Sequence, residues 1–158
     1  MAFVFACELP DGLWYDVTRD VWVEDLGNGH VHLGMTDPAQ TRAGRILYVR
    51  ARTGRRVTAG KSVATIESAK WVGPVPSPLD GEVVAHNPRV VENPNVINQD
   101  PYGAWLVELA PTTLALEESG LLRGESAVAA YREKLHAEGL TCLRCADENP
   151  SRQSPKEA

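Results

Sequence analysis

The 158-residue sequence predicts a mainly β protein with a single compact domain. Three observations lead to this prediction. Short apolar runs are bounded by Gly, Pro, Asn or Asp, one pair of runs encloses an Asn-Gly turn, and helical periodicity is strong only near the C-terminal end. A chain of this length can bury a proper core, but it is too short for separate substrate and cofactor domains.

The first predicted elements are a hairpin and a short helix. Residues 21–33 alternate apolar and polar side chains around Asn28-Gly29, and this dipeptide accepts the positive φ angles of a tight primed turn. Thr36 can cap a helix that has proline near its first turn. We therefore expect a short connector helix over 38–43 that ends at Gly44.

Four further strands make up the expected centre of the domain, at 46–49, 62–66, 83–86 and 105–109. A weak internal echo divides them into two halves, because Gly-Arg-Ile-Leu opens the first half and Gly-Glu-Val-Val opens the second. Two similar halves can cover each other's apolar faces. The expected architecture is therefore a sandwich or flattened barrel with few exposed edges.

After residue 111 the composition changes to Ala, Leu, Glu and Arg, and an apolar stripe of helical period predicts a helix over 126–138 that docks on the β-core. Gly139 stands where the C-terminal cap belongs. Residues 1–140 are expected to form the domain. The cysteine-containing extension at 141–158 is expected to be largely flexible, because its end lacks apolar residues.

Composition and charge exclude several functional classes. A net charge of −5 and a pI near 5.4 argue against a surface that neutralises phosphates, so no nucleic-acid partner is expected. Arginines between Arg42 and Arg56 indicate a solvated or partner-facing patch. The sequence has no signal-peptide pattern or membrane-spanning run, which predicts a cytoplasmic protein that does not bind membranes. In that reducing compartment Cys7, Cys142 and Cys145 are expected to be thiols.

The segment around Lys70 carries the candidate chemistry. Lys70 follows the strand at 62–66 and precedes residues 76–81, which are not expected to form a ladder because they contain so many prolines. We therefore expect the lysine at or beside a tight turn, on a rigid base from which an attached group can enter another protein's active site. The alternative is an ordinary exposed lysine, which is the commoner case for an isolated lysine in a turn.

Several separated motifs resemble those of the glycine cleavage system H protein family, over about residues 13–138. They are His-Leu-Gly-Met-Thr-Asp-Pro-Ala-Gln at 32–40, Gly-Arg-Ile at 44–46, Gly-Lys-Ser at 60–62, Glu-Ser-Ala-Lys at 67–70, Ser-Pro-Leu-Asp-Gly-Glu-Val at 77–83, and the blocks within 93–103. The resemblance implies a lipoyl-type hybrid barrel-sandwich of two sheets with approximate two-fold symmetry. It also implies a carrier rather than an enzyme, with lipoic acid joined by an amide bond to Lys70.

The resemblance assigns further residues to the cofactor-binding turn. Glu67 and Ser68 belong to its motif, and Glu67 is expected to help a lipoate-attaching enzyme recognise the site; an exposed strand-end carboxylate is the alternative. Trp71 replaces a small or polar residue of the family, and either packs at the core edge or contacts the lipoyl sulfur or a partner. For Cys142 and Cys145 a redox pair is favoured over half of a zinc site, and an incidental or structural role is the alternative.

Trp71, the Arg-rich stretch at 50–56 and the two late cysteines resemble the lipoate-binding proteins that accompany heterodisulfide-reductase-like complexes in bacterial sulfur oxidation. The expected function is therefore a lipoylated carrier of a sulfur-bound intermediate in such a pathway. The alternative is a glycine cleavage H protein that carries the aminomethyl group. Expected partners are a heterodisulfide-reductase-like complex or the glycine cleavage enzymes, together with dihydrolipoamide dehydrogenase. A biotinyl carrier is disfavoured, because Ala69-Lys70-Trp71 differs from the Met-Lys-Met of biotin domains.

Overall fold

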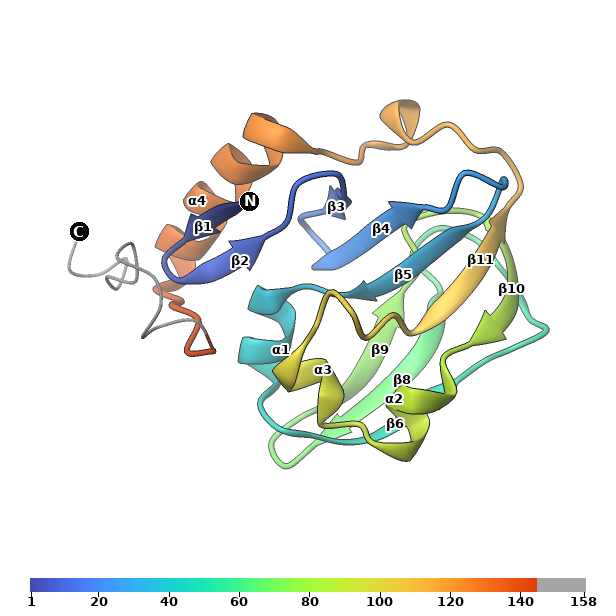
Figure 1. Cartoon of the computed structure of the whole chain (residues 1–158), viewed down its shortest axis with the longest axis horizontal. Coiled ribbons are helices and arrows are strands. Elements are labelled where there is room, and N and C mark those ends of the chain that lie inside the picture. Colours follow the sequence, from blue (N-terminus) through green and yellow to red (C-terminus); the bar gives the residue numbers. More distant parts are fainter. Residues whose placement is uncertain (145–158) are drawn as a thin grey trace.

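Short antiparallel strands make up most of the computed structural model, which describes residues 1–144 (Figure 1). The strands are β1 (Ala2–Val4), β2 (Cys7–Leu9), β3 (Trp14–Asp16), β4 (Val21–Asp25), β5 (Val31–Met35), β6 (Ile46–Ala51), β7 (Arg56–Val57), β8 (Ser62–Ser68), β9 (Val72–Pro76), β10 (Gly81–His86) and β11 (Val107–Pro111). The helices are α1 (Asp37–Ala43), α2 (Pro88–Glu92), α3 (Val96–Gln99), the 3₁₀ helix η1 (Glu117–Ser119) and α4 (Gly124–Glu138).

The strands form three sheets. A six-stranded sheet has the order β3-β4-β5-β11-β10-β7, a three-stranded sheet has the order β6-β8-β9, and β1 pairs with β2. Each half of the internal echo forms an antiparallel pair, β6 with β8 in one sheet and β10 with β11 in the other. The six-stranded sheet ends at β3 and β7 and does not close into a barrel.

The main core lies between the six-stranded and three-stranded sheets. Leu33 of β5, Ile66 of β8 and Val83 of β10 belong to one cluster of buried side chains and are fully buried. Each such side chain contributes roughly 1.5–3 kcal/mol through removal from water, compared with about 0.5–1.5 kcal/mol for a typical neutral hydrogen bond. The predicted mainly β fold of two apposed sheets with a C-terminal helix is confirmed.

A second core joins α4 to the N-terminal hairpin and the outer side of the six-stranded sheet. Tyr131 and Leu135 of α4 pack in one cluster with Tyr15, Trp22 and Cys142. The helix ends where predicted, with Gly139 in the left-handed conformation at φ 66°. Figure 1 shows that α4 lies beside β1 rather than over the three-stranded sheet.

Two local predictions differ from the structure. The β4–β5 hairpin is present, but Gly27 and Gly29 have the positive φ angles, and Leu26 N donates to His30 O across a wider loop than a two-residue Asn-Gly turn. Pro76, which was not expected in a ladder, belongs to β9. Among the described residues that strand pairs with β8 alone, and an edge strand tolerates residues without an N–H.

The short helix α1 follows the prediction closely. The Thr36 side chain accepts a hydrogen bond from Ala39 N, and Gly44 ends the helix at φ 79°.

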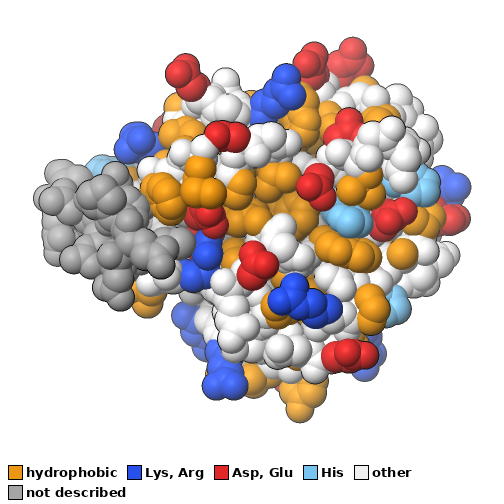
Figure 2. Space-filling model, viewed as in Figure 1, with side chains coloured by type: hydrophobic (Ala, Val, Ile, Leu, Met, Phe, Trp, Pro, Cys, Tyr) orange, Lys and Arg blue, Asp and Glu red, His pale blue; other side chains and the backbone are white. Residues whose placement is uncertain are grey.

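Figure 2 shows charged side chains of both signs scattered over one face of the molecule, with apolar side chains gathered across its middle. No helix among residues 1–144 is long and apolar enough to cross a bilayer.

The prediction that all cysteines are thiols is wrong for two of them. Cys7 and Cys142 form a disulfide and are both fully buried. The pairing arises because β2 and the segment after α4 run side by side, with Cys142 N donating to Phe5 O. Cys142 is therefore not a free partner for a Cys142–Cys145 redox pair, and neither bonded cysteine is available as a zinc thiolate. Cys145 lies outside the described residues.

Candidate functional site

Lys70 lies at the tip of a tight hairpin between β8 and β9. Glu67 pairs with Val72, and Ser68 N donates to Trp71 O at 2.7 Å, so that Ala69 and Lys70 are the two tip residues. The Lys70 side chain is exposed. The tight turn predicted from the proline-rich sequence is therefore present, and it leads into β9, a strand that is not predicted from the sequence.

Ser68 fixes the base of this turn to the end of α1. Its Oγ donates a 2.6 Å hydrogen bond to the carbonyl oxygen of Ala43, while Lys70 N donates to the same Oγ at 3.4 Å. Ser68 is only 6% exposed, so water competes little for these bonds. The lysine therefore projects from a backbone that is tied to a neighbouring element.

Gly44 lies directly beneath the Lys70 side chain. A Cβ at this position would come within 2.9 Å of Lys70 Cε, and the φ of +79° also disfavours any other residue. The aliphatic part of Lys70 thus runs over the helix end while its amine stays accessible. From the sequence, Gly44 is expected at a helix terminus and in a family motif, but not in contact with Lys70.

An apolar groove of about 240 Å³ lies beside the turn. Its apolar lining includes Met35, Ala43, Trp71 and Val75, and its charged lining is Arg19, Asp20 and Arg42. The Trp71 indole packs on its own strand, because a Cβ on Gly73 would lie 2.3 Å from the ring. Trp71 is 39% exposed and so forms a wall of the groove that is open to solvent.

Ion pairs and a buried tyrosine hold the charged wall of the groove. Arg42 forms ion pairs with Asp20 and with Glu138 of α4, and Lys134 Nζ lies 3.3 Å from Asp20. The Tyr131 hydroxyl donates to Asp20 Oδ1 at 3.1 Å. Burial raises the pKa of Tyr131 well above its usual value, so this hydroxyl remains a donor at neutral pH.

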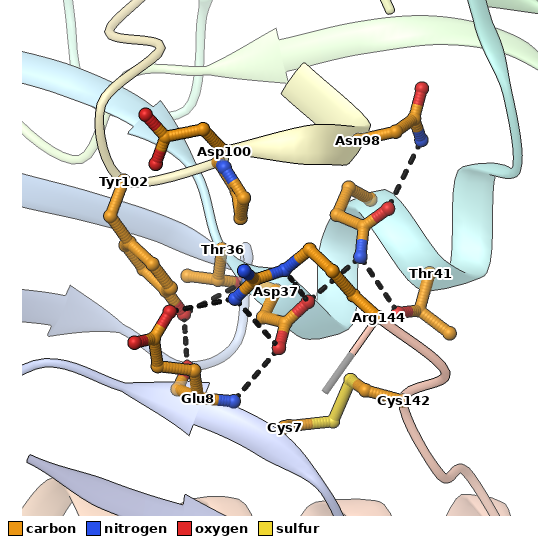
Figure 3. A network of polar contacts seen from close by, with 12 residues as sticks. Cys7, Glu8, Thr36, Asp37, Thr41, Asn98, Asp100, Tyr102, Cys142 and Arg144 are labelled. Atoms are coloured by element: carbon orange, nitrogen blue, oxygen red, sulfur yellow. Dashed lines mark hydrogen bonds and ion pairs between the residues drawn. A yellow bond between two sulfur atoms is a disulfide. The ribbon is translucent and has the colours of Figure 1, made fainter. Parts of the chain in front are cut away.

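A polar network around Asp37 holds the other end of α1 (Figure 3). The fully buried Asp37 carboxylate accepts hydrogen bonds from Glu8 N at 2.8 Å and Gln40 Nε2 at 2.7 Å, and it forms an ion pair with Arg144. Asn98 Nδ2 donates to Gln40 Oε1 at 3.0 Å and to Gly44 O at 2.8 Å.

Sequence reasoning did not identify this network, although Asp37 and Asn98 both lie in the quoted family motifs. The residues come from four separate parts of the chain, and only the fold brings them together. The other predicted site residue, Glu67, is exposed on the outer face of β8, opposite Tyr48 and Val72 on the neighbouring strands.

The comparisons with known proteins agree with this arrangement. The sequence profile of the family described as "Glycine cleavage H-protein" matches residues 13–134. Glycine cleavage system H protein 3 of Aquifex aeolicus (strain VF5) is 47% identical over 144 residues, covering 88% of this chain and 89% of that protein. Probable glycine cleavage system H protein 2 of Sulfurisphaera tokodaii is 42% identical over 148 residues, covering 91% and 99%.

A solved structure extends the likeness to the fold. The crystal structure of a glycine cleavage system H protein from Mycobacterium marinum aligns with a TM-score of 0.67 and 28% identity, over 78% of this chain and 98% of that one. The sequence profile, the relatives and the fold all lead to the same result. The chain belongs to the glycine cleavage H-protein family, whose members are lipoyl carriers and not catalysts.

Proposed function

We propose that Lys70 carries lipoic acid through an amide bond and that the protein presents this arm to partner enzymes. The observation that carries the proposal is the position of Lys70, exposed at the tip of a two-residue hairpin whose base Ser68 ties to α1. An arm on such a base moves without deforming the fold. Its reactive end then stays at high effective concentration near any docked enzyme.

The groove beside the turn fits the chemistry of a lipoyl group. Amide formation removes the lysine charge and adds an apolar chain, and the attached dithiolane supplies the redox and transfer chemistry. Met35, Ala43 and Trp71 offer apolar surface for that chain next to its attachment point. In this proposal Trp71 supports the arm, and Glu67 is an exposed recognition residue for the lipoate-attaching enzyme.

We infer that the arm serves the glycine cleavage enzymes, in which case it carries an aminomethyl group and dihydrolipoamide dehydrogenase reoxidises its dithiol. The names of the relatives favour this assignment. A second candidate is a sulfur-bound intermediate passed to a heterodisulfide-reductase-like complex. The cation-rich stretch at 50–56 and the bulky Trp71 favour that candidate, because both depart from the usual residues of glycine cleavage carriers.

Intact mass tests the attachment site. The protein is incubated with a lipoate-attaching enzyme and lipoate, and a mass gain of one lipoyl group is expected for the natural sequence. Lys70→Arg should abolish the gain. Lys61→Arg is the matched control, because Lys61 is also exposed and also lies in a turn, in which its backbone N–H donates to Thr58 O. A gain that survives Lys70→Arg contradicts the assignment.

Reconstitution separates the two pathways. The lipoylated protein is mixed with purified glycine cleavage enzymes, and glycine-dependent release of carbon dioxide is expected. The Lys70→Arg protein should give none. If the lipoylated protein also gives none, while a glycine cleavage carrier of the same organism is active, the aminomethyl assignment fails and the sulfur carrier becomes the better candidate.

A further inference from the structure

The stretch from 42 to 61 is the most positively charged part of the chain. It contains seven Arg and Lys residues and no Asp or Glu, although the whole chain has a net charge of −5. Six of these cations form no ion pair within residues 1–144, namely Arg45, Arg50, Arg52, Arg55, Arg56 and Lys61. Most of this charge is therefore not used to hold the fold together.

The strand register places part of this charge on one face beside Lys70. Tyr48, Glu67 and Val72 form one row across β6, β8 and β9, immediately before the lysine turn. Arg50 lies in the next row on the same face, because side chains in a strand alternate between the two faces. Figure 1 shows these strands together at the bottom of the view, away from α4.

The same face also exposes apolar side chains. Tyr48 is 66% exposed, Val72 is 65% exposed and Leu47, at a bulge in β6, is 41% exposed. Leu47 and Tyr48 are neighbours on β6, and Val72 lies two strands away in the same row, with the exposed Glu67 between Tyr48 and Val72. Three large exposed apolar side chains at one end of a sheet are more than the scattered singles that need no explanation. They lie at the end of the sheet that carries Lys70.

The charge continues to the far end of the sheet. Arg52, Arg55, Arg56 and Lys61 line an open cavity of about 500 Å³. Arg45 precedes β6 at the opposite end, near the lysine turn. At about 3.3 Å per residue, the strand separates these two ends by roughly 20 Å. The cations therefore follow a line from the base of the arm across the sheet.

We propose that this outer face, formed by Leu47, Tyr48, Arg50 and Val72 with the cation-lined cavity, binds a partner protein whose active-site opening is surrounded by Asp and Glu. That this partner is the enzyme that receives the arm rests on the proposed function. A protein fits better than a small anion for two reasons. The charge extends over roughly 20 Å, and the exposed apolar side chains have no role in binding a small anion.

The two kinds of residue have different roles in such docking. The unpaired cations attract an acidic surface and raise the rate of productive encounter, and salt weakens this attraction. Tyr48 and Val72 supply the apolar contact that excludes water after encounter. Since both lie one residue pair from the turn, a partner docked here has Lys70 at the edge of its contact area.

A peptide titration followed by NMR tests the face without requiring lipoylation. The probe is a synthetic peptide that alternates pairs of Glu with Leu or Phe, and its counterpart has Lys in place of Glu. Backbone shift changes are expected at Tyr48, Arg50 and Val72 with the acidic peptide only. Raising ionic strength from about 0.05 M to about 0.5 M should weaken binding about tenfold, because the Debye length falls severalfold.

Matched variants assign the binding to this face. Arg50→Glu should weaken the acidic peptide about tenfold, whereas Arg132→Glu, an exposed arginine on α4, should change binding less than about twofold. Equal effects of the two variants, or shift changes on another surface, would overturn the proposal. The proposal would also be overturned if the NMR shift changes were confined to the cation-lined cavity and citrate alone reproduced them, because that result would indicate a small-anion site.

The outcome is independent of the function test. Unlipoylated protein is sufficient for the titration, so the face can fail while Lys70 is still modified. Conversely, a bare Lys70 would remove the proposed function but leave the peptide result intact.

Discussion

Ser68 connects the lysine turn to the rest of the fold through one side-chain hydrogen bond to Ala43 O. Ser68→Ala removes the donor and leaves that carbonyl unpaired at a largely buried site. We expect the free energy of unfolding to fall by about 1–2 kcal/mol. Lipoylation of Lys70 should also slow, because the turn loses its tie to α1. Denaturant unfolding and timed intact-mass measurements check the two effects.

Ser62→Ala is the control for this substitution. The Ser62 hydroxyl also bonds a backbone carbonyl, that of Ala64, but within its own strand and at the other end of the sheet. This variant should keep the normal lipoylation rate. If both variants slow lipoylation equally, the bond from Ser68 to α1 has no special role in presenting the lysine.

At the scale of single residues, the sequence was sufficient where the chemistry is local. Lys70, Glu67 and Ser68 lie in one short motif, so their proximity follows from the chain itself. The partner of Ser68 is 25 residues away and the contact of Asn98 with Gly44 spans 54 residues. No periodicity or propensity encodes such pairs, because they exist only after the strands have paired and α1 has packed.

Among the secondary-structure elements, the N-terminal hairpin depends most on a covalent link. The Cys7–Cys142 disulfide joins β2 to the segment after α4, and Arg144 adds an ion pair to Glu8 at 2.7 Å. Cys7→Ser should lower the free energy of unfolding by about 5 kcal/mol, since the chain-entropy model gives this value for a loop of such length. Thermal unfolding with and without reductant provides the measurement.

Reductant also provides the control. Reduction of the natural protein should lower its unfolding temperature to that of Cys7→Ser, and reductant should leave the variant unchanged. An identical response of both proteins would show that the bond contributes nothing to stability. The bond was not predictable from the sequence, because cysteine counting in a protein expected to be cytoplasmic argues for thiols.

The elements differ in how well their sequences predicted them. Apolar runs bounded by turn residues located β6, β8, β10 and β11, and helical period located α4. By contrast, β1 and β3 have three residues each, too few to show an alternation. The edge strand β9 was missed because its prolines suggested a loop. Proline is tolerated in an edge strand. Whether a strand lies at the edge or in the centre is decided only when the sheet is assembled, so the sequence of β9 alone does not show it.

At the scale of the whole molecule, removal from water raises the pKa values of three tyrosines, the buried Tyr15 and Tyr131 and the partly buried Tyr102. The folded state keeps them protonated, so their contribution to stability is complete below about pH 10 and is lost as the pH rises above that value. Each can contribute a slope of up to about 1.4 kcal/mol per pH unit. Denaturant unfolding at pH 9 to 11.5 should therefore show a steep loss of stability.

Single Tyr→Phe variants test the source of this loss. Tyr131→Phe should make the alkaline slope shallower, even though it also removes a hydrogen bond to Asp20 and lowers stability at neutral pH. Equal slopes in the natural protein and in Tyr131→Phe would contradict the assignment. At this scale the arginine-rich segment is visible in the sequence as a run of cations. Its position on the same face as Tyr48 and Val72 follows only from the strand register.

The disulfide also has a mechanical consequence. It joins residues 135 positions apart, so nearly the whole described chain is a closed ring with short ends. When force is applied to the two termini, roughly 450 Å of contour length stays hidden until the sulfur–sulfur bond is cut. A cellular unfolding motor that pulls on one end of the oxidised protein must accordingly translocate two strands at once.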